Sequence, residues 1–125
     1  MGKKFLLDTN VIIDFCSFSL PNKSHQLIAS IIDRKPLISV INKIELSSLV
    51  DVPPAIITFL ELTDIIQLNN EIVDQTILLR KKYRIKLPDA MIAASALVVG
   101  CTLITHNLKD FANIKGLKVM DSYVV

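Results

Sequence analysis

Short apolar runs alternate along this chain with longer segments whose apolar residues recur at helical spacing. The runs are continuously apolar rather than alternating with polar residues, which is typical of strands covered by helices on both faces. Charged residues, Pro or Asn bound most of them. We expect strands over residues 4–7, 37–41, 65–68, 101–105 and 118–120.

Helical periodicity fills the segments between these strands. Ile72, Thr76 and Leu79, for example, share one face of a helix. Pro54 suits a first helical turn and Gly100 the residue after a last one. We expect helices from Val11 into the turn at 19–22, over 24–34, 43–50, 55–62, 70–83 and 89–99, and in a short turn before Phe111.

This order of elements predicts parallel strands joined by helical crossovers. We expect an α/β fold with three layers, in which helices cover both faces of a mostly parallel sheet of about five strands. At 125 residues, without a linker, repeat or low-complexity tract, the chain is expected to form one domain over 1–125.

The composition supports a buried sheet and excludes several classes of protein. Hydrophobic residues make up 51% of the chain and the mean hydropathy is +0.50. The longest uncharged stretch, between Asp89 and His106, is shorter than the ~20 apolar residues of a membrane span. We therefore expect a cytoplasmic protein, with Cys16 and Cys101 as buried free thiols. The net charge of +2 is too small to indicate nucleic acid by itself.

Polar residues with oxygen atoms follow the apolar runs at several places. Asp8, Glu45 and Asn107 each come after an expected strand, Asp89 opens a helix, and Asp110 lies in the last short turn. The carboxyl ends of parallel strands meet at one edge of a sheet, where ligands bind. These residues are therefore expected to meet in one pocket, although they are far apart in sequence.

Each of these acids also has a purely structural interpretation. Asp8 suits an N-cap, and Glu45 lies three residues after Asn42, as in a capping box. Asp89 suits the first turn of a helix, and Asn107 and Asp110 suit a cap before Phe111. Taken singly, each position favours structure. Taken together, they favour a cation site.

Several carboxylates in one pocket repel one another, so without a cation the pKa of at least one should rise. Oxygen ligands without a Cys/His cluster suit Mg²⁺ or Mn²⁺ rather than zinc. A carboxylate-bound metal in an open cleft suits phosphodiester hydrolysis, because it polarises a phosphate oxygen and activates a bound water.

Four segments in order along the chain resemble the four motifs of the PIN domain. They are residues 6–11 (LLDTNV), Glu45-Leu46, residues 87–94 (LPDAMIAA) and residues 103–111, with Asn107 and Asp110-Phe111. The closest resemblance is to the VapC-type toxins of toxin–antitoxin pairs. It implies a PIN-like three-layer α/β/α fold, a metal-dependent endoribonuclease that hydrolyses RNA, Mg²⁺ or Mn²⁺ as cofactor, a small antitoxin as partner, and a homodimer.

The resemblance also implies roles for individual residues. Asp8, Glu45 and Asp89 match the core metal-binding acids. The fourth position is open: Asn107 offers an amide oxygen without charge, and Asp110 offers the charge three residues later. The candidate catalytic acids are thus Asp8, Glu45, Asp89 and Asp110, and the candidate metal ligands are these four and Asn107. Thr9 and Thr105 are expected to hydrogen-bond to the ligands. One or two metals remain possible.

Five cations lie directly before Asp89: Arg80, Lys81, Lys82, Arg84 and Lys86. They suit a helix C-terminus and equally an RNA-binding rim, with Tyr83 as a stacking surface. The two interpretations are compatible. His106 is not assigned a catalytic role, and His25 is expected on the surface.

Segments 11–18 and 56–62 contain more apolar residues than two small helices need in order to pack on one core. Any of these residues that are exposed would mark a surface that binds an antitoxin or a second copy of the chain. Two alternative functions stay open: a PIN-like RNA-processing nuclease without antitoxin, and a non-catalytic RNA- or protein-binding module on the same fold.

Overall fold

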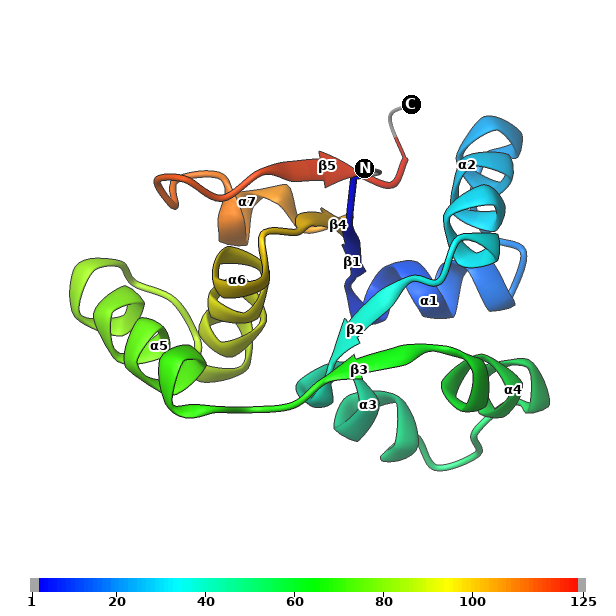
Figure 1. Ribbon diagram of the computed structural model, residues 1–125. Coiled ribbons are helices and arrows are strands. Elements are labelled where there is room, and N and C mark those ends of the chain that lie inside the picture. Colours follow the sequence, from blue (N-terminus) through cyan, green and yellow to red (C-terminus); the bar gives the residue numbers. More distant parts are fainter. Residues whose placement is uncertain (1–2, 124–125) are drawn as a thin grey trace.

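A single five-stranded sheet organises the computed structural model, which describes residues 3–123 (Figure 1). Its order is β3-β2-β1-β4-β5, and every pair of neighbours is parallel. The sheet is therefore entirely parallel rather than mostly parallel. The strands are β1 (Phe5–Leu7), β2 (Leu37–Ser39), β3 (Asp64–Ile66), β4 (Thr102–Thr105) and β5 (Val119–Asp121).

Helices cover both faces of this sheet, as the continuous apolar runs predicted. They are α1 (Thr9–Cys16), α2 (Asn22–Asp33), α3 (Val40–Ser47), α4 (Pro54–Leu62), α5 (Asn70–Lys82), α6 (Leu87–Val99) and α7 (Leu108–Phe111). Figure 1 shows α5, α6 and α7 on one side of the sheet and α1, α2 and α4 on the other.

Two buried clusters form the core, one on each face. Leu6 packs with α5 and α6 residues such as Leu79 and Ile92, whereas Leu7 packs with α1 and α2 residues such as Ile12 and Ile28. Successive residues of a strand point to opposite faces, so adjacent leucines serve different clusters. The three-layer α/β/α architecture is confirmed.

The boundary between β2 and α3 differs from the prediction of a strand over 37–41 and a helix over 43–50. The Ser39 hydroxyl accepts the Ile41 N–H at 3.1 Å, and the Asn42 side-chain oxygen accepts the Ser39 N–H at 2.8 Å. This capping box starts the helix at Val40. The predicted pairing of Asn42 with Glu45 was wrong, because Asn42 is the third residue of the helix and not its cap.

Other boundaries move by one to a few residues. Strand β3 covers 64–66 rather than 65–68, and β5 begins and ends one residue later than expected. Gly100 ends α6 in the left-handed region, with φ of 82°, as its position predicted. Cys101 is buried as expected, but Cys16 is only partly buried, and both are free thiols. Within residues 3–123, no helix has the length and apolar character to cross a bilayer.

Candidate functional site

Asp8 follows β1 at the carboxyl edge of the sheet and lies beside the end of β4. Leu7 pairs with Ile104, and the Asp8 N–H donates to the Ile104 carbonyl at 2.9 Å. This register places the Thr105 hydroxyl next to the Asp8 carboxylate, to which it donates at 2.7 Å. Asp8 is only 6% exposed, so the parallel pairing produces a buried carboxylate at the centre of the sheet.

Four donors hold this buried carboxylate in place. Besides Thr105, they are the backbone N–H of Thr9 at 2.9 Å, the side-chain amide of Asn10 at 3.3 Å and that of Asn42 at 3.4 Å. Burial raises the pKa of Asp8, and the hydrogen bonds oppose this effect only in part. Asp8 is thus both the N-cap of α1 and a fixed acid at the sheet edge.

Glu45 joins this group through Thr9. The Thr9 hydroxyl donates to Glu45 Oε1 at 2.6 Å and accepts the Asn42 amide at 3.0 Å. Asn42 and Glu45 lie three residues apart on α3 and therefore share a face of the helix. The capping of α3 at Ser39 thus decides which side of that helix meets Asp8. Glu45 itself is exposed.

Asp89 and Asp110 approach from the other side. Asp89 lies partly buried in the first turn of α6, and Asp110 lies exposed in α7. Burial, followed by the charges of Asp110, Asp8 and Glu45, raises the pKa of Asp89 to about 6, although Lys86 acts in the opposite direction. Four acids from four segments are therefore close enough to repel one another, and one pKa rises as the sequence predicted.

Asn107 lies at the same edge. Its backbone N–H donates to the Thr105 hydroxyl at 3.0 Å, and its own side chain is exposed. It occupies the N-cap position of α7, but its side chain makes no capping hydrogen bond. The capping alternative for Asn107 is therefore wrong, and within residues 3–123 no hydrogen bond occupies its side-chain amide.

The oxygen atoms of these side chains are suitable ligands for a hard cation, but the side chains are not close enough together to coordinate one. Its acidic and amide groups offer only oxygen ligands, as Mg²⁺ and Mn²⁺ prefer. In residues 3–123 no three His, Cys, Asp or Glu side chains are near enough to hold a metal ion. Glu45 and Asp110 are exposed. A bound cation would relieve the repulsion at Asp89, which the charge of Lys86 opposes only in part.

A cavity of about 280 Å³ adjoins Asp89 and Asp110, and its wall includes Arg84, Lys86 and Lys109. All five cations predicted for an RNA-binding rim are exposed. They do not act alike, however. The Arg80 guanidinium donates to the Ile85 carbonyl at 2.8 Å and thereby stabilises the turn after α5. Lys81 and Lys82 line a second cavity, whose wall includes no acid.

Two residues at the site were not among the predicted ones. Asn10 and Asn42 both donate to Asp8. Their spacing was a usable signal, because Asn10 lies in the first turn of the helix that Asp8 caps, and Asn42 lies one helical turn before Glu45. The prediction that His25 is a simple surface residue was incomplete, since its ring stacks on Phe15 and Phe18 with centroids 4.4 and 5.0 Å apart.

Comparison with known proteins gives matches over nearly the whole chain. Residues 5–117 match the family model of the PIN domain. A chain in a toxin–antitoxin complex from Klebsiella pneumoniae is 31% identical, with 98% of this chain and 100% of that chain covered and a TM-score of 0.74. No curated protein matches in sequence.

Two further solved structures share the fold. One is VapBC2 from Rickettsia felis, bound to a DNA fragment from its promoter, with 23% identity, 94% and 97% coverage of this chain and that chain, and a TM-score of 0.78. The other is DNA-bound VapBC from Salmonella typhimurium, with 24% identity, 97% and 99% coverage, and a TM-score of 0.78. With the family model matched over residues 5–117 and the acids of its four motifs gathered at one sheet edge, this chain belongs to the PIN domain family.

Proposed function

We propose that this protein is a metal-dependent endoribonuclease and the toxin of a toxin–antitoxin pair. One observation carries the proposal: Asp89 is partly buried beside three other acids, and burial together with the charges of Asp110, Asp8 and Glu45 raises its pKa. Four separate segments bring these acids together at the edge where α/β sheets bind ligands. A fold maintained for stability alone has no need to gather four carboxylates at one edge, whereas a cation-dependent nuclease does.

Asp8, Glu45 and Asp89 would hold the metal, with Asn107 and Asp110 at the fourth position. When bound, Mg²⁺ or Mn²⁺ supplies a Lewis acid for the scissile phosphate and lowers the pKa of a bound water. The chain's own residues prepare this chemistry. Four donors fix the orientation of the Asp8 carboxylate, and the Thr9 hydroxyl holds Glu45 toward it.

RNA would bind on the Asp89 side of the site. Arg84, Lys86 and Lys109 line the cavity next to Asp89 and Asp110, which supports a role for them in binding the phosphates that flank the cleaved bond. This assignment keeps two of the five cations predicted from sequence and adds Lys109. Arg80 donates to the Ile85 carbonyl, and Lys81 and Lys82 line another cavity.

An antitoxin segment would bind on the opposite side of the molecule from α5. A largely apolar groove of about 330 Å³ lies between α1, α2 and α4, where Phe18 and Leu62 are 79% and 76% exposed. Exposed apolar surface of this kind marks interaction sites. The 31% identical chain from Klebsiella pneumoniae comes from a toxin–antitoxin complex.

We also propose that the protein forms a homodimer. A measurement of its mass in solution would test this.

Cleavage of fluorescent single-stranded RNA tests the proposed activity. Wild type, Asp89→Asn and the exposed-loop control Asp51→Asn are compared with Mn²⁺, Mg²⁺ or EDTA, and a matched DNA panel tests the choice of RNA. We expect metal-dependent RNA cleavage by wild type and the control, and none by Asp89→Asn. Folded wild type that neither cleaves RNA nor gains thermal stability with Mn²⁺ would instead indicate a non-catalytic binding module.

Growth on expression tests the toxin role separately. Expression of wild type should arrest growth, Asp89→Asn should not, and co-expression of a small protein encoded next to this one should restore growth. RNA cleavage without growth arrest would favour an RNA-processing nuclease without antitoxin.

A further inference from the structure

The segment that ends β5 reaches across to α1, although the two are at opposite ends of the chain. The Tyr123 hydroxyl donates to Asp14 Oδ2 at 2.9 Å, and the Ser122 N–H donates to the Thr105 carbonyl at 3.3 Å. The second contact continues the β4–β5 pairing past Asp121, whereas the first joins that segment to a helix, and neither involves an acid of the proposed metal site. Residues 121–123 thus join α1 to the end of β4.

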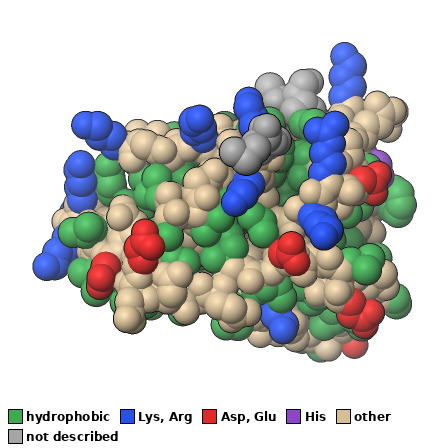
Figure 2. Space-filling view, in the orientation of Figure 1, with side chains coloured by type: hydrophobic (Ala, Val, Ile, Leu, Met, Phe, Trp, Pro, Cys, Tyr) green, Lys and Arg blue, Asp and Glu red, His purple; other side chains and the backbone are tan. Residues whose placement is uncertain are grey.

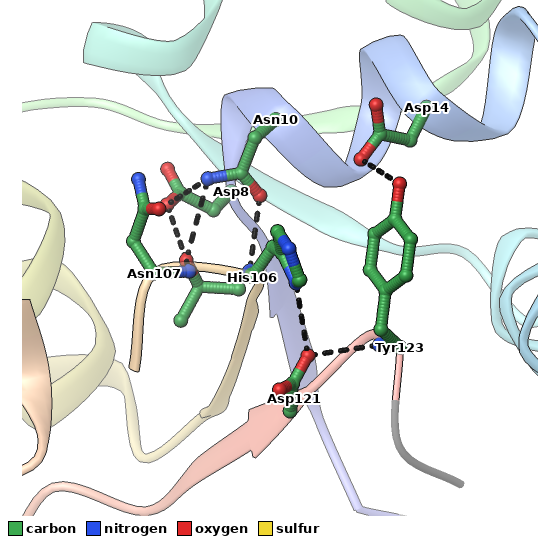
Figure 3. Close-up of polar contacts among 8 residues, drawn as sticks. Asp8, Asn10, Asp14, His106, Asn107, Asp121 and Tyr123 are labelled. Atoms are coloured by element: carbon green, nitrogen blue, oxygen red, sulfur yellow. Dashed lines mark hydrogen bonds and ion pairs between the residues drawn. The ribbon is translucent and has the colours of Figure 1, made fainter. Parts of the chain in front are cut away.

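The same segment also holds the side chain of His106. The Tyr123 N–H donates to Asp121 Oδ1 at 2.8 Å, and His106 Nδ1 lies 3.3 Å from the same oxygen. The His106 and Tyr123 rings contact each other, with centroids 3.9 Å apart at 38°. Figure 3 shows the His106 ring directed toward Asp121 and Tyr123 and away from Asp8.

The backbone of His106, by contrast, is part of the site. Its N–H donates to Asn10 Oδ1 at 3.1 Å, and the Asn10 amide donates to Asp8 Oδ2 at 3.3 Å (Figure 3). The next N–H, that of Asn107, donates to the Thr105 hydroxyl that binds Asp8. His106 therefore links two groups of contacts: its ring belongs to segment 121–123, and its backbone belongs to the hydrogen bonds around Asp8.

Asn10 and Asp14 lie four residues apart on α1 and so share one face of the helix. Asn10 binds the β4–α7 loop directly, and Asp14 binds it through Tyr123. Asp8 is the N-cap of α1, so the orientation of α1 at the sheet edge bears on the orientation of the Asp8 carboxylate. Two attachment points, one turn apart, fix that angle better than one.

We propose that segment 121–123 positions the active site, with Tyr123 as a positioning residue that holds His106, and with it the β4–α7 loop, against α1. The expected effect on RNA cleavage rests on the proposed nuclease function. The expected effect on the structure of the loop rests on the hydrogen bonds alone. Tyr123 does not contact the acids of the proposed metal site. Removing its hydroxyl should therefore change how those acids are arranged but leave every proposed metal ligand in the protein.

Three substitutions isolate the contact. Tyr123→Phe removes the hydroxyl but keeps the ring on His106. Asp14→Leu removes the acceptor, whereas Asp14→Asn keeps an oxygen that can accept the same hydrogen bond. If the contact is what matters, Asp14→Asn should resemble wild type, and the double variant Tyr123→Phe/Asp14→Leu should be no worse than either single variant, because residues in one hydrogen-bond network are not additive. Asp74→Leu, at an exposed position of α5, is the control for the Asp→Leu change.

The structural arm measures amide hydrogen exchange in metal-free protein. We expect faster exchange at the His106 and Asn107 amides in Tyr123→Phe and Asp14→Leu, by about threefold to tenfold for the loss of one hydrogen bond. Amides within α5, remote from the contact, should not change. Unchanged exchange at His106 and Asn107, or an equal increase throughout the protein, would overturn the proposal in favour of general stabilisation.

The activity arm measures RNA cleavage with Mn²⁺. We expect kcat to fall about threefold to tenfold in Tyr123→Phe, with KM for RNA unchanged and recovery in Asp14→Asn. A rise in KM alone, or a fall in Asp14→Asn as large as in Asp14→Leu, would contradict it. If wild type fails to cleave RNA, the proposed function fails, and the exchange measurement still decides whether segment 121–123 holds the loop.

Discussion

Asp89 gives the sharpest test of how this site is built, because function and stability should oppose each other there. Asp89→Asn removes a charge that burial and three neighbouring carboxylates disfavour. Without metal, the variant should therefore be more stable than wild type. With metal the order should reverse, because the variant has lost a charged ligand.

The size of the effect follows from the pKa of Asp89. A rise from 3.8 to about 6 corresponds to a ceiling of about 3 kcal/mol, at ~1.4 kcal/mol for each pKa unit. Asp89 is only partly buried, so solvent screening should reduce this by about half. Asn also loses the favourable interaction of a charge with the N-terminus of α6, about 0.5 kcal/mol. We expect a net stabilisation of about 1 kcal/mol without metal.

The pH dependence has a defined sign. The pKa of Asp89 is higher in the folded protein than in the unfolded chain, so the folded state binds the proton more tightly and wild type loses stability as pH rises from 3.8 to about 6. The loss is complete above pH 6 and absent below 3.8. Asn does not titrate in this range. The difference in free energy of unfolding between Asp89→Asn and wild type should therefore vanish near pH 4 and be largest at pH 7 to 8.

Urea unfolding in EDTA at pH 4, 6 and 8, followed by circular dichroism, measures this difference. Asp51→Asn removes a charge from an exposed loop and should stay within about 0.5 kcal/mol of wild type at each pH. With Mn²⁺ at about 100 times its Kd, wild type should gain about 2.7 kcal/mol and overtake the variant. An Asp89→Asn protein less stable than wild type in EDTA at pH 8 would refute the reasoning from repulsion and burial.

Three further predictions concern the neighbours of the acids. Thr105→Val keeps the shape of the side chain but removes the hydroxyl that donates to Asp8 and accepts from Asn107. The free energy of unfolding in urea should fall by about 1–3 kcal/mol, and the rate of RNA cleavage should also fall. An unchanged free energy of unfolding would contradict the assigned hydrogen bonds. Asn42→Ala removes the capping box of α3 and a donor to Asp8, and should cost about 1–2 kcal/mol, whereas the exposed Lys43→Ala on the same helix should cost little. Lys86→Ala should raise KM for RNA and lower the salt dependence of binding by about one ion, without changing the choice of sequence; a fall in kcat with constant KM would place Lys86 at the chemistry instead.

The sequence specified the architecture because its signals are local. Continuous apolar runs, helical stripes and the Pro and Gly at helix ends predicted the order of elements and hence a parallel sheet between helices. Errors arose where two local signals competed. Val40 and Ile41 are β-branched and extended the predicted strand, but the Ser39–Asn42 capping box starts a helix there.

The acids could be named from sequence, since each follows an element whose end is readable. Their relations could not. Whether Asp8 is held by Asn10, Asn42 and Thr105 depends on the register of β1 against β4 and on which face of α3 turns inward. Those are properties of packed elements, and no spacing along the chain records them.

The sequence by itself therefore determined the order of the elements, the parallel sheet and which acids are candidates for the site, because propensity, periodicity and strand ends act over a few neighbouring residues. Only the tertiary structure decided the pKa of Asp89, the different roles of Arg80 and Lys86, and the link from Tyr123 through His106 to the site. Burial, charge repulsion and hydrogen bonds between distant segments depend on distances in space, and these exist only once the sheet and its helices have packed.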